Sequence, residues 1–282
     1  MAKGAKKGTF LAGLRQESDD ISRSLTTSIR EAKRHASQPR RVGYPSVSAV
    51  IPALNEAQNL PHVLPKLVGL VDEVIIVDGL SNDDTVEVAR RLNNDVRIAE
   101  ELTPGKGAAL RRGFAEARGD IIVALDADGS TDPNEIPAFV GVLLAGADFV
   151  KGSRFMQGGG TADMPRIRKW GNAALTRLVR ILFGGQYTDL CYGYNAFWAD
   201  VLPRLELDAN GFEIETLMNI RALRAGLKVA EVPSFEERRM HGEAKLRALP
   251  DGWRVTKTIL RERFRARLSQ QSAPLPRREN GD

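Results

Sequence analysis

The chain has 282 residues, 42% hydrophobic and 27% charged, a composition typical of a globular protein with a sizeable core. Its net charge of +5 is unevenly distributed, because residues 1–41 carry 10 basic and 4 acidic side chains and residues 251–282 carry 8 and 4. The acidic middle of the chain argues against a nucleic-acid-binding core. The basic ends favour an anionic surface such as a membrane, with solvated, disordered ends as the alternative.

The single cysteine, Cys191, excludes an intrachain disulfide and a cysteine metal cluster, which fits a reducing compartment. Residues 9–14 are too short an apolar patch for a signal-peptide core, and no run of about 18 uninterrupted apolar residues occurs. We therefore expect a cytoplasmic protein whose contact with a membrane, if it makes one, is peripheral and on the inner face.

Strand and helix patterns alternate from Pro45 onward. The expected strands are 47–51, 73–77, 96–99, 121–125, 148–152 and 228–232. The expected helices are 59–71, 82–92, 105–117, 134–145, 166–182 and 212–225. Short connections between them predict right-handed βαβ units, hence an α/β fold with a mostly parallel central sheet flanked by helices. We divide the chain into a mobile basic extension (1–44), one domain (45–250) and a basic amphipathic helix and tail (251–282).

Two further segments carry expectations of their own. The glycine run within 157–161 suits a flexible loop that orders over a substrate. In the C-terminal segment, one side of a helix would carry the apolar residues Trp253, Ile259, Leu260, Phe264 and Leu268. Such a helix would lie on anionic lipid, pack back on the domain or pair with a partner.

The most informative stretch is DIIVALDADGSTDP, residues 120–133, in which a buried apolar strand stops at Asp126 and Asp128. Ligands of open α/β sheets bind at the carboxyl ends of the strands. Two carboxylates one residue apart can share Mg²⁺ or Mn²⁺, which can in turn hold a diphosphate. Taken alone, the pair suits a turn or helix cap better than a metal site.

Acidic side chains also follow the first two expected strands. Glu56 comes after the first strand and Asp78 after the second, so that both should meet Asp126 and Asp128 at one edge of the sheet. Such carboxylates can accept hydrogen bonds from a base or from ribose hydroxyls. The four acids therefore predict one cleft for a nucleotide and a metal.

Six segments in this order resemble the family 2 glycosyltransferases of GT-A (Rossmann-like) fold: VSAVIPALNEAQNL, EVIIVDGLSNDDT, PGKGAALRRGFAEARGDIIVALDADG, KGSRF, GFEIETLMNIRALRAGLKVAEVP and RRMHGEAKL. The resemblance covers residues 46–247 and is closest to polyprenyl-phosphate sugar transferases such as dolichol-phosphate mannose synthases. It implies a GDP- or UDP-sugar donor, a divalent cation (Mg²⁺ or Mn²⁺), inversion at the anomeric carbon and polyprenyl phosphate as acceptor.

The resemblance also implies roles for individual residues. Those that would bind the donor are Pro52, Leu54, Glu56, Asp78, Lys106, Asp126 and Lys245. Asp126 and Asp128 match the family's Asp-x-Asp pair for ribose and metal, and Arg239 matches a position near the donor diphosphate. Arg154, with Arg166 or Arg168, would face an acceptor phosphate. Residues 129–131 depart from the relatives, which leaves the third metal ligand open between Ser130 and His241.

The mechanism depends on the acceptor. A lipid phosphate is already anionic and needs only arginines to position it, whereas a soluble hydroxyl acceptor, the alternative, needs a general base. Asp189 is the candidate base, with a turn-stabilising aspartate as the competing interpretation. Arg111, Arg112, Arg221 and Arg224 have the spacing of solvated helix faces.

Three other functions compete with this one. LDADGS also matches the nucleophile loop of haloacid-dehalogenase-like phosphatases, although that loop normally ends the first strand of its domain. A sugar nucleotidyltransferase would need a glycine-rich and basic loop after the first strand, where this chain has PALNEAQN. A nucleotide-sugar-binding module without turnover is the non-catalytic alternative.

Overall fold

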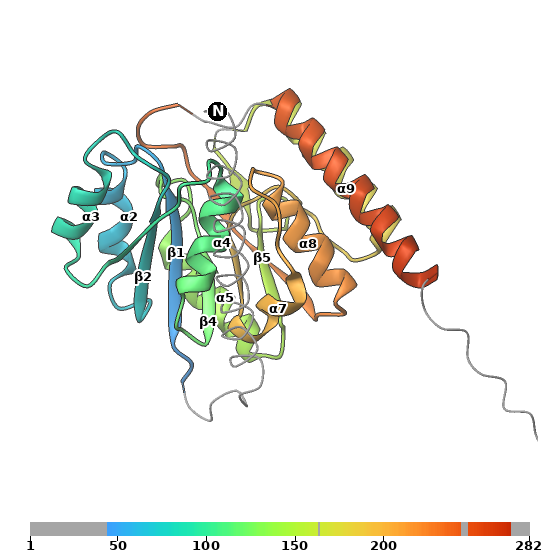
Figure 1. Ribbon diagram of the computed structural model, residues 1–282, viewed down its shortest axis with the longest axis horizontal. Helices are drawn as coiled ribbons and strands as arrows, with labels where there is room; N and C mark the ends of the chain where they lie inside the picture. Colours follow the sequence, from blue (N-terminus) through green and yellow to red (C-terminus); the bar gives the residue numbers. More distant parts are fainter. Residues whose placement is uncertain (1–43, 163, 244–247, 272–282) are drawn as a thin grey trace, which may run out of the picture.

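The computed structural model describes residues 44–162, 164–243 and 248–271 (Figure 1). The strands are β1 (Val47–Ala53), β2 (Glu73–Asp78), β3 (Arg97–Glu100), β4 (Ile121–Ala124), β5 (Phe149–Ser153), β6 (Gly160–Thr161), β7 (Asn195–Trp198), β8 (Val229–Pro233) and β9 (Phe235–Glu236). The helices are α2 (Leu60–Leu67), α3 (Thr85–Leu92), α4 (Lys106–Glu116), α5 (Ile136–Leu144), α6 (Arg166–Phe183), α7 (Leu202–Leu205), α8 (Ile214–Arg224) and α9 (Ala248–Gln271), with short 3₁₀ turns at Pro133–Glu135 and Ala199–Val201.

The central sheet has the strand order β3-β2-β1-β4-β7-β5-β8 within the described residues. All its pairings are parallel except those of β7, which runs antiparallel to β4 and β5. The prediction of a mostly parallel sheet is therefore confirmed. Strand order reverses between β1 and β4, because β2 and β3 extend to one side of β1 and β4 lies on the other. Ligands of open α/β sheets bind at the carboxyl ends of the strands at such a switch point, and we call this region the crevice.

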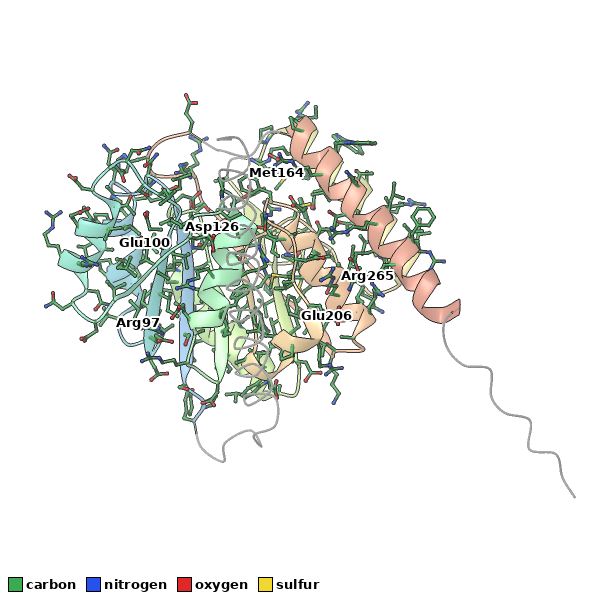
Figure 2. All side chains as sticks on the ribbon, in the orientation of Figure 1. Arg97, Glu100, Asp126, Met164, Glu206 and Arg265 are labelled. Atoms are coloured by element: carbon green, nitrogen blue, oxygen red, sulfur yellow. The ribbon has the colours of Figure 1, made fainter. Side chains whose placement is uncertain are left out.

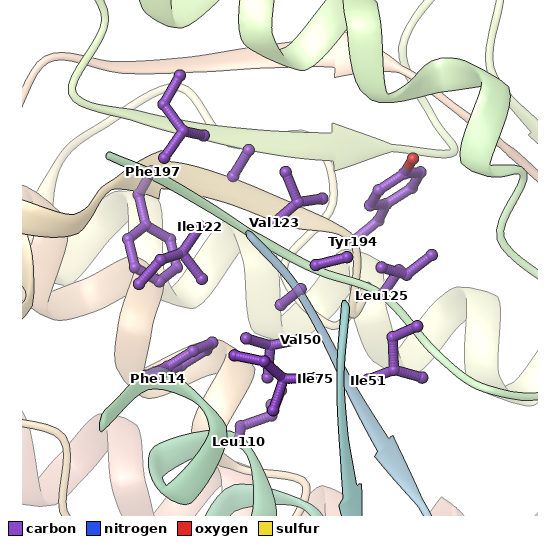
Figure 3. Packing of buried hydrophobic residues seen from close by; sticks show 14 of the residues in the cluster. Val50, Ile51, Ile75, Leu110, Phe114, Ile122, Val123, Leu125, Tyr194 and Phe197 are labelled. Carbon is purple, nitrogen blue, oxygen red and sulfur yellow. The ribbon is translucent and has the colours of Figure 1, made fainter. Parts of the chain in front are cut away.

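The core lies between this sheet and the helices on its two faces. Right-handed crossovers in opposite directions place α4 on the face opposite to α2 and α3 (Figure 1). Figure 3 shows Leu110 and Phe114 of α4 beneath Val50 and Ile75 of the sheet. Tyr194 lies beside Val123. Strand β4 is buried along its whole length, as its apolar run predicts.

Several local expectations were wrong in detail. Strand β7 was not predicted, because NAFW is too short and too little patterned to stand out after a turn-rich segment. Helix α2 ends at Leu67 rather than Val71. Part of the glycine run, expected to be a flexible loop, forms strand β6 and pairs with β9. A Cβ at Gly159 would collide with the backbone of Ser153, so close packing also explains a glycine there.

The C-terminal helix α9 packs against α6 and α8, and the predicted domain boundary at 250/251 falls inside it. Its inner face buries Val255, Thr258, Ile259 and Glu262. Of the apolar residues expected on one side of this helix, Ile259 is buried, whereas Trp253, Leu260 and Phe264 are exposed, so the five do not share one side; the side chain of Leu268 lies outside the described residues. Among the described helices, none is both long and apolar enough to cross a membrane.

Candidate active site

The acidic side chains that follow β1, β2 and β4 lie at one edge of the sheet, as predicted. These three strands are neighbours, and the residues concerned are Glu56, Asp78, Asp126 and Asp128. Figure 2 shows Asp126 toward the same end of the molecule as Glu100, the last residue of β3, whereas Arg97 at the start of β3 lies lower. The edge is therefore the carboxyl edge of the sheet.

Asp78 is oriented by the turn that follows β2, and Glu56 is held by Thr85 of α3 and by Asn59 just before α2. The Ser81 backbone N–H donates to Asp78 at 3.2–3.3 Å. The Glu56 N–H donates to the Thr85 hydroxyl at 2.8 Å, and the Asn59 side chain donates to the Glu56 carboxylate at 2.6 Å. Both carboxylates are 6% exposed, and a carboxylate has about four acceptor positions. Asp78 can therefore accept further bonds from a ligand at this edge of the sheet.

Asp128 is held between its own turn and the segment after β9. Its Oδ1 accepts from the Ser130 hydroxyl at 2.6 Å and from the Ser130 N–H at 3.0 Å. Its Oδ2 accepts from Arg239 at 3.1 Å, and Arg239 also donates to both oxygens of Glu56 at 2.5 and 2.7 Å. One guanidinium thus joins the acid after β1 to the acid after β4.

Residues 237–241 lie over the Asp128 turn. The Glu237 N–H donates to the Ser130 carbonyl at 2.8 Å and the Met240 N–H to the Asp128 carbonyl at 3.2 Å. The next N–H, of His241, donates to Asn59 at 2.9 Å. Gly129 beneath them has φ +79°, and a Cβ there would lie 2.9 Å from the Met240 side chain. The segment that resembles the diphosphate-binding motif therefore contacts the predicted metal ligands.

Asp126 pairs with Lys106, which comes from the first turn of α4. The Lys106 ammonium lies 2.6 Å from the carboxylates of both Asp126 and Glu215. Burial alone would lower the pKa of Lys106, but the two carboxylates raise it above its ordinary value. Burial, together with the charges of Asp128 and Glu215, raises the pKa of Asp126 to about 6, and Lys106 opposes this shift. Lys106 therefore stays charged.

Glu215 and Gly193 are site residues that the sequence analysis missed. Glu215 lies in the first turn of α8 and is 4% exposed. A Cβ at Gly193 would lie 2.7 Å from the Lys106 ammonium, 2.8 Å from Glu215 and 3.0 Å from Asp126. The sequence offered two signals for these residues, an acid in a helix predicted to be amphipathic and a glycine inside YGYN. Neither signal is specific for a binding site.

Arg154 and Asp189 form a second, buried group. Arg154 donates to Asp189 at 2.6 and 2.9 Å and to Glu236 at 3.0 Å, and its guanidinium lies 4.6 Å from the centre of the Tyr192 ring. Burial alone would raise the pKa of Asp189, but the Arg154 guanidinium lowers it below its ordinary value. This bidentate pairing suits a structural aspartate better than a free base, and the catalytic role of Asp189 stays a prediction.

The remaining predicted site residues lie around these groups. Pro52 is in β1, and Leu54 follows it and is 37% exposed. Arg166 and Arg168 begin α6. The exposed His241 ring lies 5.7 Å from that of His62, centre to centre. Lys245 falls outside the described residues.

The acids of the crevice suit a divalent cation that is held mainly by a diphosphate and water. In the part of the chain that the structure describes, no three His, Cys, Asp or Glu side chains are grouped to hold a metal by themselves. Mg²⁺ is usually bound through one or two carboxylates together with substrate phosphates and water. Asp126 and Asp128 supply these carboxylates, and both already contact cationic side chains.

Comparison with known proteins identifies the family. Residues 48–205, more than half of the chain, match the family model described as "Glycosyl transferase family 2". The chain belongs to this family. The resemblance of the six sequence segments is thereby confirmed, and this assignment decides against the phosphatase and nucleotidyltransferase alternatives.

Two curated relatives of this family 2 glycosyltransferase act on lipid phosphates by name. An undecaprenyl-phosphate mannosyltransferase of Micrococcus luteus is 35% identical over 71% of this chain and 87% of its own length. A dolichol-phosphate mannosyltransferase of Pyrococcus furiosus is 34% identical over 71% of this chain and 59% of its own length.

Among solved structures, the glucosyl-3-phosphoglycerate synthase of Mycobacterium tuberculosis, in complex with Mn²⁺, uridine diphosphate and phosphoglyceric acid, matches with a TM-score of 0.63. It is 26% identical and covers 83% of this chain and 82% of its own. The fold of this family 2 glycosyltransferase is GT-A-like, as predicted.

Proposed function

We propose that this enzyme transfers a sugar, with inversion, from a GDP- or UDP-sugar to a polyprenyl phosphate. The bond between the anomeric carbon and the β-phosphate oxygen of the donor breaks, and a bond to an acceptor phosphate oxygen forms. The nucleoside diphosphate leaves. The observation that carries the proposal is the junction of Glu56, Arg239 and Asp128 over the crevice, in a chain similar to lipid-phosphate mannosyltransferases.

The crevice provides groups for each part of the donor. Asp78 would accept a hydrogen bond from the base. Asp126, held in position by Lys106, would accept one from ribose. Asp128, which is oriented by the hydroxyl of Ser130, would hold a Mg²⁺ or Mn²⁺ ion together with Asp126. When bound, such an ion neutralises charge on the departing diphosphate. Arg239, with Lys245 in the same motif, would donate to the diphosphate oxygens.

The pairing of Asp189 supports an acceptor that needs no general base. A base has to be free to accept a proton, and Asp189 is fully buried with both its oxygens on Arg154. A lipid phosphate is anionic at neutral pH and can attack directly once it is positioned. Arg166 and Arg168, at the start of α6, are the predicted positioning groups. A lipid acceptor also places this enzyme peripherally at a membrane, on its cytoplasmic face.

A hydroxyl acceptor is the second candidate function. It is favoured by the structural similarity to an enzyme crystallised with phosphoglyceric acid. Such an acceptor would require a base, for which Asp189 would have to leave Arg154. The two candidates therefore differ in both acceptor and mechanism.

A matrix of donors and acceptors tests the proposal. GDP- and UDP-sugars are each incubated with Mg²⁺ or Mn²⁺ and with either a short-chain polyprenyl phosphate or phosphoglycerate, and glycosylated product is measured. We expect product with polyprenyl phosphate, abolished by chelation of the cation. Product with phosphoglycerate alone would favour the second candidate, and no product with any pair would favour a binding module.

Matched aspartates test the role of Asp128. Asp128→Asn should remove nearly all transfer, whereas Asp132→Asn in the same loop should retain it, because Asp132 caps the 3₁₀ turn that follows. Equal product from the wild type and Asp128→Asn would contradict the role of Asp128 in catalysis.

A further inference from the structure

Helices α6 and α9 together form an exposed surface of unusual composition. Their inner faces meet in one cluster that contains Val179, Val255 and Ile259. Their outer faces expose large apolar side chains, and we call these the α6–α9 surface: Ile167, Trp170 and Ile181 of α6, and Trp253, Leu260 and Phe264 of α9.

The two tryptophans of this surface are unusually exposed. Trp170 is 77% exposed and Trp253 is 68% exposed, so two of the three tryptophans of the chain lie largely in solvent. The spacings Trp170–Ile181 and Trp253–Leu260–Phe264 correspond to 11, 7 and 4 residues, which place the side chains in stripes along their helices. Single exposed apolar residues are common, but two such stripes on helices that pack against each other indicate a contact surface.

The exposed charges carried by the two helices have one sign, although Arg261 and Arg265 of α9 pair with Asp208 and Glu206 outside these helices. Helix α6 contains no acidic residue, and the two acids of α9, Asp251 and Glu262, are buried on its inner face. The exposed basic residues of the two helices include Arg166, Lys169, Arg177, Arg180, Arg254, Lys257 and Arg261. A partner of this surface therefore has to be both apolar and anionic.

From this composition we infer that the α6–α9 surface docks on an anionic lipid membrane, with its tryptophans and aliphatic side chains in the interfacial layer and its arginines and lysines on lipid phosphates. Tryptophan is enriched at membrane interfaces, and basic amphipathic helices bind anionic lipid. A second copy of the chain fits poorly, because a symmetric contact would set basic residues against basic residues.

We expect the membrane contact at this whole surface rather than at the C-terminal segment alone. A role of this contact in sugar transfer rests on the proposed function. Arg166 and Arg168, the predicted acceptor-binding residues, lie in the first turn of α6. Met164, just before that turn, lies toward the same end of the molecule as Asp126 (Figure 2). Docking through α6 would therefore bring the carboxyl edge of the sheet close to a lipid-borne phosphate.

Tryptophan fluorescence can locate the contact in the full-length protein without donor or acceptor. Trp198 is buried in β7, so a change on adding vesicles reports Trp170 and Trp253. With vesicles of phosphatidylcholine and phosphatidylglycerol we expect a blue shift that persists in Trp170→Phe and in Trp253→Phe. Vesicles of phosphatidylcholine alone should give little shift. An absent shift, or an equal shift with both kinds of vesicle, would overturn the inference.

Vesicle flotation then tests the apolar and charged parts separately. Trp170→Ser/Trp253→Ser should lose binding, whereas Val68→Ser/Leu102→Ser, which changes exposed apolar residues elsewhere, should keep it. Arg177→Gln/Lys257→Gln should weaken binding to anionic vesicles by roughly tenfold or more. Unchanged flotation of the tryptophan variant, or a change in its sedimentation from dimer to monomer, would contradict membrane docking.

Transfer in detergent separates this inference from the proposed function. With a short-chain polyprenyl phosphate in micelles, the Trp170→Ser/Trp253→Ser variant should match wild-type activity. Its thermal midpoint should also be unchanged, because both side chains are exposed. If wild type shows no transfer but floats with anionic vesicles, only the proposed function fails.

Discussion

Arg239 and Asp128 lie 111 residues apart in the sequence, yet their side chains meet at 3.1 Å over the crevice. The same guanidinium bonds to Glu56, so two carboxylates of the sheet edge share one cation. Burial alone would lower the pKa of Arg239, but Glu56 and Asp128 raise it above its ordinary value. The segment after β9 is thereby fixed to the predicted metal site.

Arg239→Ala should lower kcat/KM for the donor by about 10²–10³, because it removes the cation that we propose donates to the leaving diphosphate. Arg238→Ala is the matched control, since Arg238 is adjacent and exposed, and it should stay within about twofold of wild type. Steady-state kinetics at varied donor concentration measures both variants. Equal losses in the two would show that the effect is one of general charge.

Asp189→Asn distinguishes a base from a structural aspartate. We expect a loss of about 3 kcal/mol in the free energy of unfolding, because a buried ion pair is broken, but less than about tenfold loss in kcat for polyprenyl phosphate. A catalytic base would cost about 10²–10⁴ in kcat. Denaturant unfolding and kinetics below the unfolding transition measure the two effects. Glu236→Gln, which removes the other carboxylate on Arg154, is the control for the structural effect.

The carboxyl edge of the sheet could be predicted because its signals are local. Each acid directly follows an apolar strand, and parallel strands bring such positions together whatever the details of packing. The family resemblance predicted Lys106 as a donor-binding residue, but it did not predict its second partner, Glu215, which lies 109 residues away. A contact of that kind depends on how α8 packs against α4, which no periodicity encodes.

The orientation of helices was harder to predict than their position. Arg221 was expected on a solvated face, and it is 4% exposed, where it pairs with Asp208 and Glu262. In helix α9, Ile259 was expected on the same side as Trp253, but Ile259 is buried together with Glu262 while Trp253 is exposed. The buried Arg221–Glu262 pair joins the two helices. A helix with apolar residues on two sides offers more than one way to dock, and the sequence pattern alone does not choose between them.

Two glycine substitutions test the close packing around Lys106. Gly193→Ala should weaken donor binding and destabilise the fold by about 1–3 kcal/mol, because the added methyl group would meet Lys106 and Glu215. Gly141→Ala in α5 meets no atom within 4 Å and should stabilise the protein by about 0.5–1 kcal/mol. Nucleotide titration calorimetry and denaturant unfolding measure the effects. Unchanged nucleotide affinity in Gly193→Ala would contradict a role of Lys106 in donor binding.

Glu262 is a buried charged contact between α9 and the domain. Its carboxylate, fully buried, accepts from Arg221 at 2.9 Å and from Arg224 at 2.5 Å. Burial alone would raise the pKa of Glu262, but the two guanidinium groups lower it below its ordinary value of 4.5. The folded state therefore binds a proton at Glu262 less readily than the unfolded chain does.

Glu262→Gln should lower the free energy of unfolding by about 3 kcal/mol at neutral pH, because it removes the charge that compensates Arg221. A carboxylate with a lowered pKa stabilises the folded state above its unfolded pKa, so the difference from wild type should shrink as pH falls below about 4.5. Arg265→Gln, which breaks an exposed pair on the same helix, should cost less than about 1 kcal/mol. Denaturant unfolding between acid and neutral pH measures all three proteins, and a difference that does not change with pH would exclude Glu262 as the titrating group.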